Sequence, residues 1–416
     1  MSARQAEEYL LGLELFGMRF GLDRMHKLMT VLGLPQRRFD SIHVVGTNGK
    51  SSTVRFCAAI LERHGLRTGS YTSPHLRGFR ERIEVGEEPI SEADFAAAVT
   101  RAAHAAELVN RTLADDDRVT QFEALTAAAY HELARRGVEV AVVEAGLGGR
   151  FDATNVIPSK IQVLTGVGLE HTRWLGPTLR DIADEKLAVV REEAALVTPP
   201  QLDPEVERVV EAVTRRRRAR RLYAQHKLPP DARLRARGAF QRQNFALAAT
   251  AAEAFLERRL DPRPVDGAAR DTRVPGRMDL IDAAPLTIYD GAHNPDGAAA
   301  VADALREVVE GRRPRVGVMS ILEDKDAAGM LQALLPSFDR VVFTRCANPR
   351  AFSPATLETL AEKLGGSPAE TVSDPSAAVE RARELAGEGG AVLVTGSIYL
   401  VADLVREESD ARASTL

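Results

Sequence analysis

The sequence is short of cysteine, of charge of one sign and of long apolar runs, and each shortage excludes a class of protein. Its only cysteines, Cys57 and Cys346, cannot build a disulfide scaffold or a thiolate zinc site, and they suit a reducing cytosol. The 55 Lys and Arg residues are balanced by 59 Asp and Glu residues, which leaves no general attraction to nucleic acid or anionic lipid. No apolar stretch reaches the roughly 18 residues that a transmembrane helix needs.

The N-terminal segment has acidic side chains before its apolar run and no basic n-region, so we predict no secretory signal peptide. What the chain contains is ordinary for a globular protein, with 44% hydrophobic and 27% charged residues. Its 416 residues are enough for two or three domains at about 150 residues each. We therefore expect a cytoplasmic protein that acts as a monomer and has no nucleic-acid or membrane partner.

Short β-branched runs alternate with Ala- and Leu-rich stretches, a pattern typical of a parallel sheet with helical crossovers. We expect strands at residues 41–45, 138–143, 161–164, 286–289, 316–319, 340–343 and 391–394, and helices at 54–64, 120–136, 296–310, 325–335 and 375–386. The segment 260–275 is rich in Pro, Asp and Gly and lacks periodicity, which indicates the approach to a domain boundary. The sequence predicts an α/β fold, with a parallel-sheet domain over residues 1–275 and a smaller Rossmann-like domain over residues 276–416.

The heptapeptide GTNGKSS at residues 46–52 lies directly between a predicted strand and a predicted helix. Its glycines let backbone N–H groups turn toward phosphate oxygens, and the helix N-terminus adds partial positive charge. Val44 stands where the general P-loop pattern has its first glycine, so the alternative is a plain glycine-rich turn with a surface lysine. We predict a P-loop NTPase-like ATP site formed by Thr47, Asn48, Gly49, Lys50, Ser51 and Ser52.

This GTNGK variant resembles the ATP site of the Mur ligase superfamily, whose members join an amino acid to a carboxylate through an acyl phosphate. Further motifs follow along nearly the whole chain: YTSPHL at 71–76, EAGLGGRFDATN at 144–155, His171-Thr172 before WLG at 174–176, PGR at 275–277 and DGAHNP at 290–295. Together and in this order they make the chain similar to the folylpolyglutamate synthase/dihydrofolate synthase branch.

The resemblance implies that Ser73, Glu144 and His171 hold Mg²⁺, for which hydroxyl and carboxylate oxygens are suitable ligands. The imidazole would favour tolerance of Mn²⁺, and the family also implies that a K⁺ ion could bind. Taken singly, the three residues could equally be a turn serine, a strand-end ion-pair partner and a loop histidine. The family has Asp where this chain has Glu170, and Gly where it has Ser51. Ser51 could contact magnesium or cap the helix.

Lys186 matches a lysine that superfamily members commonly carbamylate, which turns a cation into a carboxylate able to hold a second magnesium ion. The alternative is a surface salt bridge on a helix. Asn244 matches an ATP-binding residue at the start of a helix, where it could also be an ordinary N-cap. Arg277 and Asp290 match residues that contact phosphate and ribose near the domain junction.

The amine substrate implied by the resemblance is L-glutamate, with His293 and Ser397 as its candidate contacts in the C-terminal domain. His293 could instead fix the loop after the preceding strand. We expect the catalytic residues to be Lys50, Lys186, Arg277 and His293.

The second substrate implied by the family carries a pterin and a carboxylate, and is either dihydropteroate or a reduced folate. Its candidate contacts are Leu22, Arg24, Pro74, His75, Phe122 and Asp152. A flat pterin needs an apolar wall and its amidine-like edge needs a carboxylate, roles that suit Phe122 and Asp152. The alternative for Phe122 is plain packing in the core of a helix.

The resemblance therefore implies a ligase that uses ATP to add L-glutamate to dihydropteroate, to the γ-carboxylate of folate polyglutamates, or to both. Another Mur-type ligase acting on a UDP-linked substrate is one alternative, although the P-loop begins too early to leave room for a separate UDP-binding domain. A non-catalytic nucleotide-binding module is the other. The basic run 214–222 (TRRRRARRL) could bind a polyanion, but it lacks interleaved aromatic residues, and we interpret it as a solvated helix end.

Overall fold

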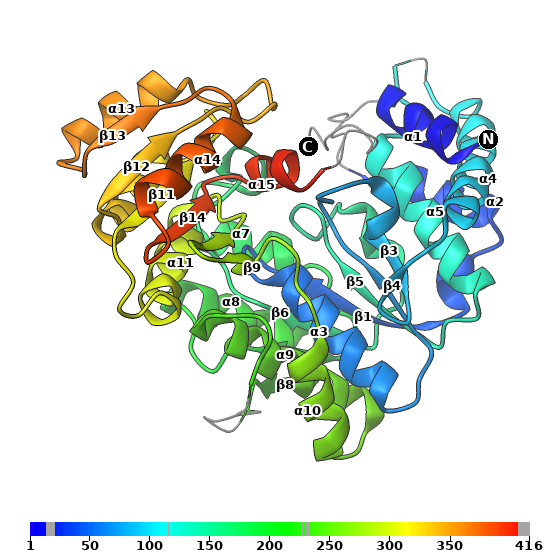
Figure 1. Cartoon of the computed structure of the whole chain (residues 1–416). Coiled ribbons are helices and arrows are strands. Elements are labelled where there is room, and N and C mark those ends of the chain that lie inside the picture. Colours follow the sequence, from blue (N-terminus) through cyan, green and yellow to red (C-terminus); the bar gives the residue numbers. More distant parts are fainter. Residues whose placement is uncertain (14–20, 115, 226–227, 229–232, 407–416) are drawn as a thin grey trace.

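The computed structural model describes residues 1–13, 21–114, 116–225, 228 and 233–406. These residues form two sheets, both mostly parallel and both packed between helices. In Figure 1 the orange and red elements around the second sheet lie at the upper left, beside the blue, cyan and green elements around the first. The predicted α/β fold is confirmed.

The first sheet contains eight strands in the described part of the chain, in the order β4-β3-β2-β5-β1-β6-β7-β8. Their bounds are β1 (Asp40–Val45), β2 (Thr68–Tyr71), β3 (Ile83–Val85), β4 (Glu88–Pro89), β5 (Val140–Glu144), β6 (Ile161–Leu164), β7 (Ala195–Thr198) and β8 (Arg220–Tyr223). The six strands from β2 to β8 in this order run parallel, and β3 and β4 continue the sheet antiparallel at one edge. The central strand β1 is paired on both sides, so the loop after it leaves the middle of the sheet, where α/β folds bind ligands.

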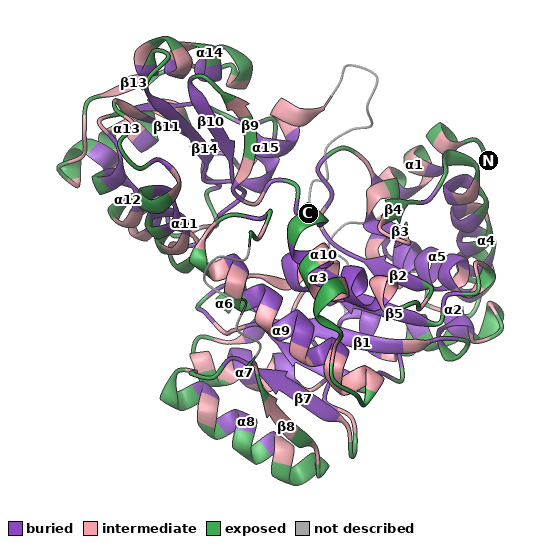
Figure 2. Ribbon diagram, turned by 60° about the horizontal axis from the view of Figure 1, so that its bottom comes forward, coloured by how far each residue is buried: buried purple, intermediate pink, exposed green. Residues whose placement is uncertain are grey.

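Helices cover both faces of the first sheet, because its strands alternate apolar side chains between two cores. The helices are α1 (Ala3–Gly12), α2 (Asp23–Val31), α3 (Lys50–Arg63), α4 (Glu92–Asn110), α5 (Gln121–Arg135), α6 (Thr172–Leu175), α7 (Leu179–Leu187), α8 (Pro204–Arg217), α9 (Ala239–Leu256) and α10 (Pro262–Asp271), with short 3₁₀ turns at η1 (Pro35–Arg37), η2 (Phe79–Arg82) and η3 (Ala153–Val156). One face packs on α3, α9 and α10; the other packs on α4 and α5 and, further along, on α7 and α8. Figure 2 shows β5 buried between these layers, and β1 is buried there except at its first residue, Asp40.

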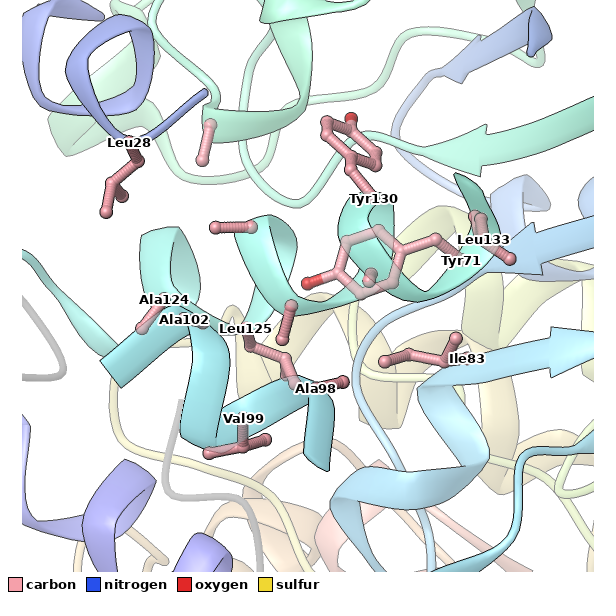
Figure 3. Packing of buried hydrophobic residues seen from close by; sticks show 14 of the residues in the cluster. Leu28, Tyr71, Ile83, Ala98, Val99, Ala102, Ala124, Leu125, Tyr130 and Leu133 are labelled. Carbon is pink, nitrogen blue, oxygen red and sulfur yellow. The ribbon is translucent and has the colours of Figure 1, made fainter. Parts of the chain in front are cut away.

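The core beneath α4 and α5 carries two neighbouring tyrosines. The ring centroids of Tyr71 and Tyr130 are 6.5 Å apart, and both residues are fully buried. Figure 3 shows them next to each other within the cluster that also holds Leu125 and Leu133. Their hydroxyls contact Thr126 and the backbone of Thr154, respectively, which satisfies the polar ends of two apolar side chains.

The second sheet has the order β13-β12-β11-β14-β10-β9 within the described residues, and only β9 runs antiparallel. Its elements are β9 (Asp279–Ala283), β10 (Leu286–Tyr289), α11 (Pro295–Val308), β11 (Arg315–Met319), α12 (Ala327–Leu334), η4 (Leu335–Ser337), β12 (Arg340–Phe343), α13 (Pro354–Lys363), β13 (Ala369–Thr371), α14 (Pro375–Ala386), β14 (Ala391–Thr395) and α15 (Ile398–Val405). Helices α11, α12 and α13 share a core with one face, and α14 and α15 share a core with the other.

Several expected elements are confirmed residue for residue, among them the strands at 161–164, 286–289 and 340–343 and the helix at 375–386. The segment 260–275 differs, because α10 occupies most of it and packs on α3. Prolines at the first and third positions of α10 cost no hydrogen bond, since the first turn of a helix has unpaired N–H groups anyway. The aperiodic interpretation of this segment was wrong.

The basic run 214–222 spans a helix end and a strand, so the interpretation as a helix end is right only for its first half. Helix α8 ends at Arg217, and β8 begins at Arg220 as the edge strand of the first sheet. Arg218 donates to Glu192 at 2.9 Å, and Arg221 donates to Glu207 at 2.9 Å. None of the described helices combines the length and the apolar character that crossing a bilayer requires.

Candidate functional site

A cavity of about 500 Å³ lies where the loops after the first sheet meet the loops after the second. Predicted site residues that line it are Arg24, Thr47, Asn48, Gly49, Lys50, Ser51, Ser52, Ser73, Pro74, Phe122, Glu144, Asp152, His171, Lys186, Asn244, Arg277, Asp290, His293 and Ser397. The structure thus brings together side chains from positions 24 to 397 at one place, as the carboxyl ends of parallel strands allow.

Two of the residues predicted to contact substrate lie outside the cavity lining. His75 is buried, accepts a hydrogen bond on Nδ1 from Nε of Arg82 at 2.9 Å and packs on the ring of Phe79. Leu22 precedes α2, and its neighbours Gly21 and Arg24 face the cavity in its place. We therefore leave Leu22 and His75 out of the site.

The P-loop is shaped by two glycines that no other residue can replace. Gly46 has φ +153°, and a Cβ there would lie 1.9 Å from Oγ1 of Thr165. Gly49 has φ +85°, and a Cβ there would lie 2.4 Å from Oδ1 of Asn244. The loop is further held by Thr47, whose N–H donates to the carbonyl of Gly166 at 2.9 Å. Helix α3 then begins at Lys50, which directs its N-terminal N–H groups into the cavity region.

Both lysines of the site turn toward the backbone of the P-loop. Nζ of Lys50 donates to the carbonyls of Gly46 and Thr47 at 3.1 Å each, and Nζ of Lys186 donates to the carbonyl of Gly46 at 2.9 Å. No carboxylate of the described chain lies within ion-pair distance of Lys186, which contradicts the surface salt bridge considered for it. Burial, and then the charge of Lys50, lowers the pKa of Lys186 to about 7.

Glu144 ends β5 with a buried carboxylate that faces the P-loop. Its Oε2 accepts the N–H of Ser73 at 3.1 Å, and the hydroxyl of Ser51 also donates to it. The cap of α3 is Gly49, so Ser51 is not a helix cap. Burial raises the pKa of Glu144, and the charge of Lys50 opposes that rise. A buried carboxylate with one lysine nearby is a suitable place for a further cation.

His171 stands at the entrance of α6 in a left-handed conformation, with φ +54°. Burial lowers the pKa of His171 to about 4, so the ring is neutral at physiological pH, as a metal-binding imidazole must be. Within the described residues no three His, Cys, Asp or Glu side chains converge as a ready metal cluster. A carboxylate, serine hydroxyls and a neutral imidazole nevertheless line the same cavity, and this donor set fits magnesium.

Glu170 joins the two sheets through their loops. Its Oε1 is 2.9 Å from Nζ of Lys325 and 3.0 Å from Nε2 of His293, and its Oε2 accepts from Nδ2 of Asn294 at 3.0 Å. Burial raises the pKa of Glu170, but the charges of His293 and Lys325 outweigh it and hold the pKa well below its ordinary value. The carboxylate is therefore ionised and connects the loop after β6 to the loops after β10 and β11.

Both ring nitrogens of His293 face hydrogen-bond acceptors. Nδ1 lies 2.9 Å from the carbonyl oxygen of Gly291, and Nε2 lies 3.0 Å from the carboxylate of Glu170. A carbonyl and an ionised carboxylate are both hydrogen-bond acceptors, so each ring nitrogen of His293 already faces a partner. The ring thereby fixes the loop after β10, one of the two roles considered for it.

An amide pair links the P-loop directly to α11. Asn48 and Asn294 exchange hydrogen bonds of 3.1 and 3.0 Å between their side chains. Asn294 is also the N-cap of α11, where its Oδ1 accepts the N–H of Gly297 at 2.8 Å. The pair therefore joins the P-loop directly to the N-terminus of α11.

The nucleotide residues expected near the junction are well fixed. Asp290 accepts the N–H groups of Met278 and Ala292 at 2.8 Å each, and burial raises its pKa while Arg277 opposes the rise. Asn244 lies in the second turn of α9, which begins at Ala239, so the N-cap alternative was wrong. Nδ2 of Asn244 donates to Oε1 of Gln241 at 3.1 Å.

In the wall of the same cavity, Phe122 and Asp152 both approach Gly146. A Cβ on Gly146 would lie 2.6 Å from the Phe122 ring and 3.2 Å from Oδ2 of Asp152, so only glycine leaves room for both. The Phe122 ring is 6.2 Å from that of Tyr71, yet Phe122 also lines the cavity, so it does more than pack in the core. Oδ2 of Asp152 accepts the N–H of Leu147 at 2.8 Å, and burial raises its pKa.

Arg24 also lines the cavity, and its positive charge is paired with carboxylates. Its Nε donates to both carboxylate oxygens of Glu123, at 2.9 and 3.0 Å, and its Nη1 donates to Asp117 at 2.7 Å. A guanidinium with two carboxylate partners has little charge left for an anionic ligand, so its position is better explained by holding α2 against α5.

The sequence reasoning did not identify Lys325 or Asn294 as functional residues, and gave Glu170 only as a departure from the family. Lys325 is 155 positions from Glu170, and no local pattern indicates such a contact. The sequence held one usable signal: Glu170 and Lys325 each follow a parallel strand, and the carboxyl ends of parallel strands lie at one edge of a sheet.

Comparison with known proteins agrees with this geometry. The family model described as "Mur ligase, glutamate ligase domain" matches residues 276–398. The dihydrofolate synthase/folylpolyglutamate synthase of Bacillus subtilis is 32% identical over 428 residues, which cover 96% of this chain and 98% of that protein.

Solved structures agree as well. Mycobacterium tuberculosis folylpolyglutamate synthase complexed with ADP matches with a TM-score of 0.90 and 32% identity over 97% of both chains. E. coli FolC in complex with DHPP and ADP matches with a TM-score of 0.85 and 26% identity over 97% of both chains. The chain belongs to the dihydrofolate synthase/folylpolyglutamate synthase family of Mur ligases.

Proposed function

We propose that the protein uses ATP to join L-glutamate to a pterin-bearing carboxylic acid, called the acceptor below. The observation that carries the proposal is that one cavity is lined both by the P-loop with its lysine and by an aromatic–carboxylate pair, Phe122 and Asp152. Relatives are named for this activity, and one solved relative holds DHPP together with ADP.

The reaction divides into two steps. An oxygen of the acceptor carboxylate attacks the γ-phosphorus of ATP, ADP leaves, and an acyl phosphate forms. The amine of glutamate then attacks the acyl carbon, and phosphate leaves with one former carboxylate oxygen. Lys50 stabilises the charge that moves in the first step, and the cationic side chain of Arg277, which lines the same cavity, adds to it.

We propose His293 as a contact for a carboxylate of glutamate because it lines the cavity wall; since its ring nitrogens face Gly291 and Glu170, the glutamate carboxylate would replace one of these two acceptors. Ser397 lines the wall on the same side and caps α15. The contacts of Glu170 and Asn48 hold the second sheet over the P-loop. This arrangement excludes water, which would otherwise hydrolyse the acyl phosphate. Asn244 and Asp290 complete the nucleotide contacts in this proposal.

Magnesium would be held by Ser73, Glu144 and His171, and would neutralise phosphate charge when bound. We propose that Lys186 becomes carbamylated and supplies a second carboxylate, since it is buried without an ion-pair partner in the described chain and its amine is easily neutral. Mass spectrometry and electron density of the ATP-analogue complex should show the added carboxylate; a bare amine in both would contradict it. Binding of Mn²⁺ or K⁺ stays a prediction.

A panel of phosphate-release assays tests the proposed function. The acceptors are dihydropteroate, a reduced folate and a UDP-muramoyl peptide, each assayed with and without glutamate. We expect phosphate release that requires glutamate and either of the first two acceptors. Release with only the UDP-linked acceptor would indicate another Mur-type ligase, and release that ignores glutamate would indicate a nucleotide-binding module. The panel also decides between the two pterin acceptors.

We further propose that residues 1–275 and 276–416 form two domains, with the boundary between α10 and β9. A cytoplasmic location, a monomeric state and the lack of a nucleic-acid partner remain predictions. The ion pairs of Arg218 and Arg221 favour the lack of a nucleic-acid partner, because these two arginines of the basic run already pair with carboxylates of the same chain.

A further inference from the structure

His43 is a fully buried histidine that the chemistry above does not use. It lies in β1, three residues before the P-loop glycine Gly46, on the face of the sheet that packs toward α5. Its Nε2 is 2.8 Å from Oγ1 of Thr154, in the 3₁₀ turn η3. Burial, and then the charge of Arg191, lowers the pKa of His43 to about 3, so the ring is neutral.

Thr154 connects this imidazole to Asp152. Its hydroxyl contacts Oδ1 of Asp152, and its backbone N–H donates to the same oxygen at 3.0 Å. An ionised carboxylate only accepts, so the Thr154 hydroxyl donates to Asp152. Its oxygen must then accept from His43, which fixes the proton of the imidazole on Nε2. The contacts form one directed chain: His43 to Thr154 to Asp152.

Packing alone does not explain a histidine at this position. Nδ1 of His43 is buried and has no hydrogen-bond partner in the described part of the chain. An unpartnered buried nitrogen destabilises a fold, so an apolar side chain would serve a purely structural role better. The positions next to it in β1, Ile42 and Val44, are apolar, as is Val45. The Nε2 contact is what the imidazole supplies.

The turn that carries Thr154 is fixed from several sides. The hydroxyl of Tyr130 donates to the carbonyl of Thr154 at 2.9 Å, and Nη2 of Arg191 donates to the carbonyl of Asn155 at 2.7 Å. The backbone is therefore rigid, and the orientation of the Asp152 carboxylate depends on its own contacts: Thr154 on Oδ1 and Leu147 on Oδ2. Asp152 lines the cavity beside Phe122.

We propose that His43 is a positioning residue for the acceptor: through the hydroxyl of Thr154, it holds the Asp152 carboxylate in the orientation that binds the pterin edge. This rests on the proposed function, in which Asp152 contacts the acceptor. The Asp152 carboxylate in the cavity wall is thereby oriented by a side chain from β1, the central strand. The same strand leads into the P-loop.

Two pairs of variants test this series of hydrogen bonds from His43 through Thr154 to Asp152. Thr154→Val removes the hydroxyl at nearly constant volume, and Thr154→Ser keeps it. His43→Leu removes the donor, and His43→Gln places an amide N–H near the position of Nε2. Loss of the hydrogen bond from the Thr154 hydroxyl to the charged Asp152 predicts that Thr154→Val raises the acceptor KM about tenfold. His43→Leu should raise it in the same direction, because the hydroxyl then loses the donor that orients it. The ATP and glutamate KM values and kcat should change less than about twofold, and Thr154→Ser and His43→Gln should restore the acceptor KM.

Ser41→Ala is the matched control, since Ser41 lies two residues earlier on the same face of β1 and its buried hydroxyl has no partner in the described chain. It should leave every KM unchanged. The double variant Thr154→Val/His43→Leu should resemble Thr154→Val alone, because the two residues act in one chain. If His43→Leu unfolds, the Thr154 pair carries the test.

An unchanged acceptor KM in Thr154→Val or in folded His43→Leu, an equal rise in Thr154→Ser, or an equal rise in the ATP KM would overturn the proposal. Asp152→Asn separates this failure from failure of the proposed function. If Asp152→Asn raises the acceptor KM while Thr154→Val does not, the acceptor site stands and only the role of His43 is wrong. If Asp152→Asn also leaves the acceptor KM unchanged, the pterin site itself is wrong.

Discussion

Replacing Lys50 with methionine is expected to lower kcat by about a thousandfold, the order lost when a preorganised charge is removed from a phosphoryl-transfer site. In the structure, Nζ of Lys50 reaches two P-loop carbonyls and stands near the buried Glu144. The ammonium is therefore held where transferred phosphate charge develops. Methionine replaces most of the apolar stem of the side chain, is one heavy atom shorter, and lacks the charge and its donors.

The fold should tolerate Lys50→Met. The carbonyl of Gly46 keeps its hydrogen bond from Lys186, so the stability cost should be below about 1 kcal/mol. Steady-state kinetics with thermal unfolding measure both effects, and Lys363→Met, on the exposed face of α13, is the control. A kcat within tenfold of the parent enzyme would mean that Lys50 is not the phosphate-binding lysine.

Replacing Glu170 with glutamine is expected to give the second-largest effect. It removes the carboxylate that, among the described residues, pairs with both His293 and Lys325, and a buried cation without its partner costs about 3 kcal/mol of unfolding free energy. Because His293 then loses the contact that orients its ring, kcat/KM for glutamate should fall about tenfold or more. Urea unfolding and glutamate titrations measure the two effects.

Glu192→Gln is the matched control for Glu170. Glu192 pairs with Arg218 at 2.9 Å, but its side chain is half exposed, so its loss should cost less than about 1 kcal/mol and leave catalysis unchanged. Equal stability of the two variants would show that Glu170 does not connect the two sheets energetically. An unchanged glutamate KM in Glu170→Gln would contradict the role of His293 in binding glutamate.

What the sequence predicted well is local. The P-loop from Gly46 to Ser52 is a contiguous motif whose backbone geometry follows from its glycines. The alternating pattern predicted three strands of the first sheet (β1, β5 and β6) and four of the second (β10, β11, β12 and β14), and it missed the others. The rule that parallel strands end at one edge of a sheet pointed to Glu144, whereas Asp290 was placed by the family resemblance.

The parts that the sequence did not predict depend on long-range contacts. The Glu170–Lys325 pair joins loops 155 positions apart, and the His43–Thr154 contact spans 111 positions. Helix α10 was not predicted because proline usually disrupts a helix, although prolines are well tolerated in the first turn, where these lie. Strand β8 was hidden in a basic run because an edge strand tolerates charge on its exposed side.

The most direct measurement follows oxygen from the acceptor. Acceptor labelled with ¹⁸O in its terminal carboxylate should transfer one labelled oxygen to inorganic phosphate for each amide formed, detected by the isotope shift in ³¹P NMR, and only when ATP and glutamate are both present. Amide formation with unlabelled phosphate would contradict activation of the carboxylate by phosphoryl transfer, and with it the catalytic role of Lys50 in the cavity.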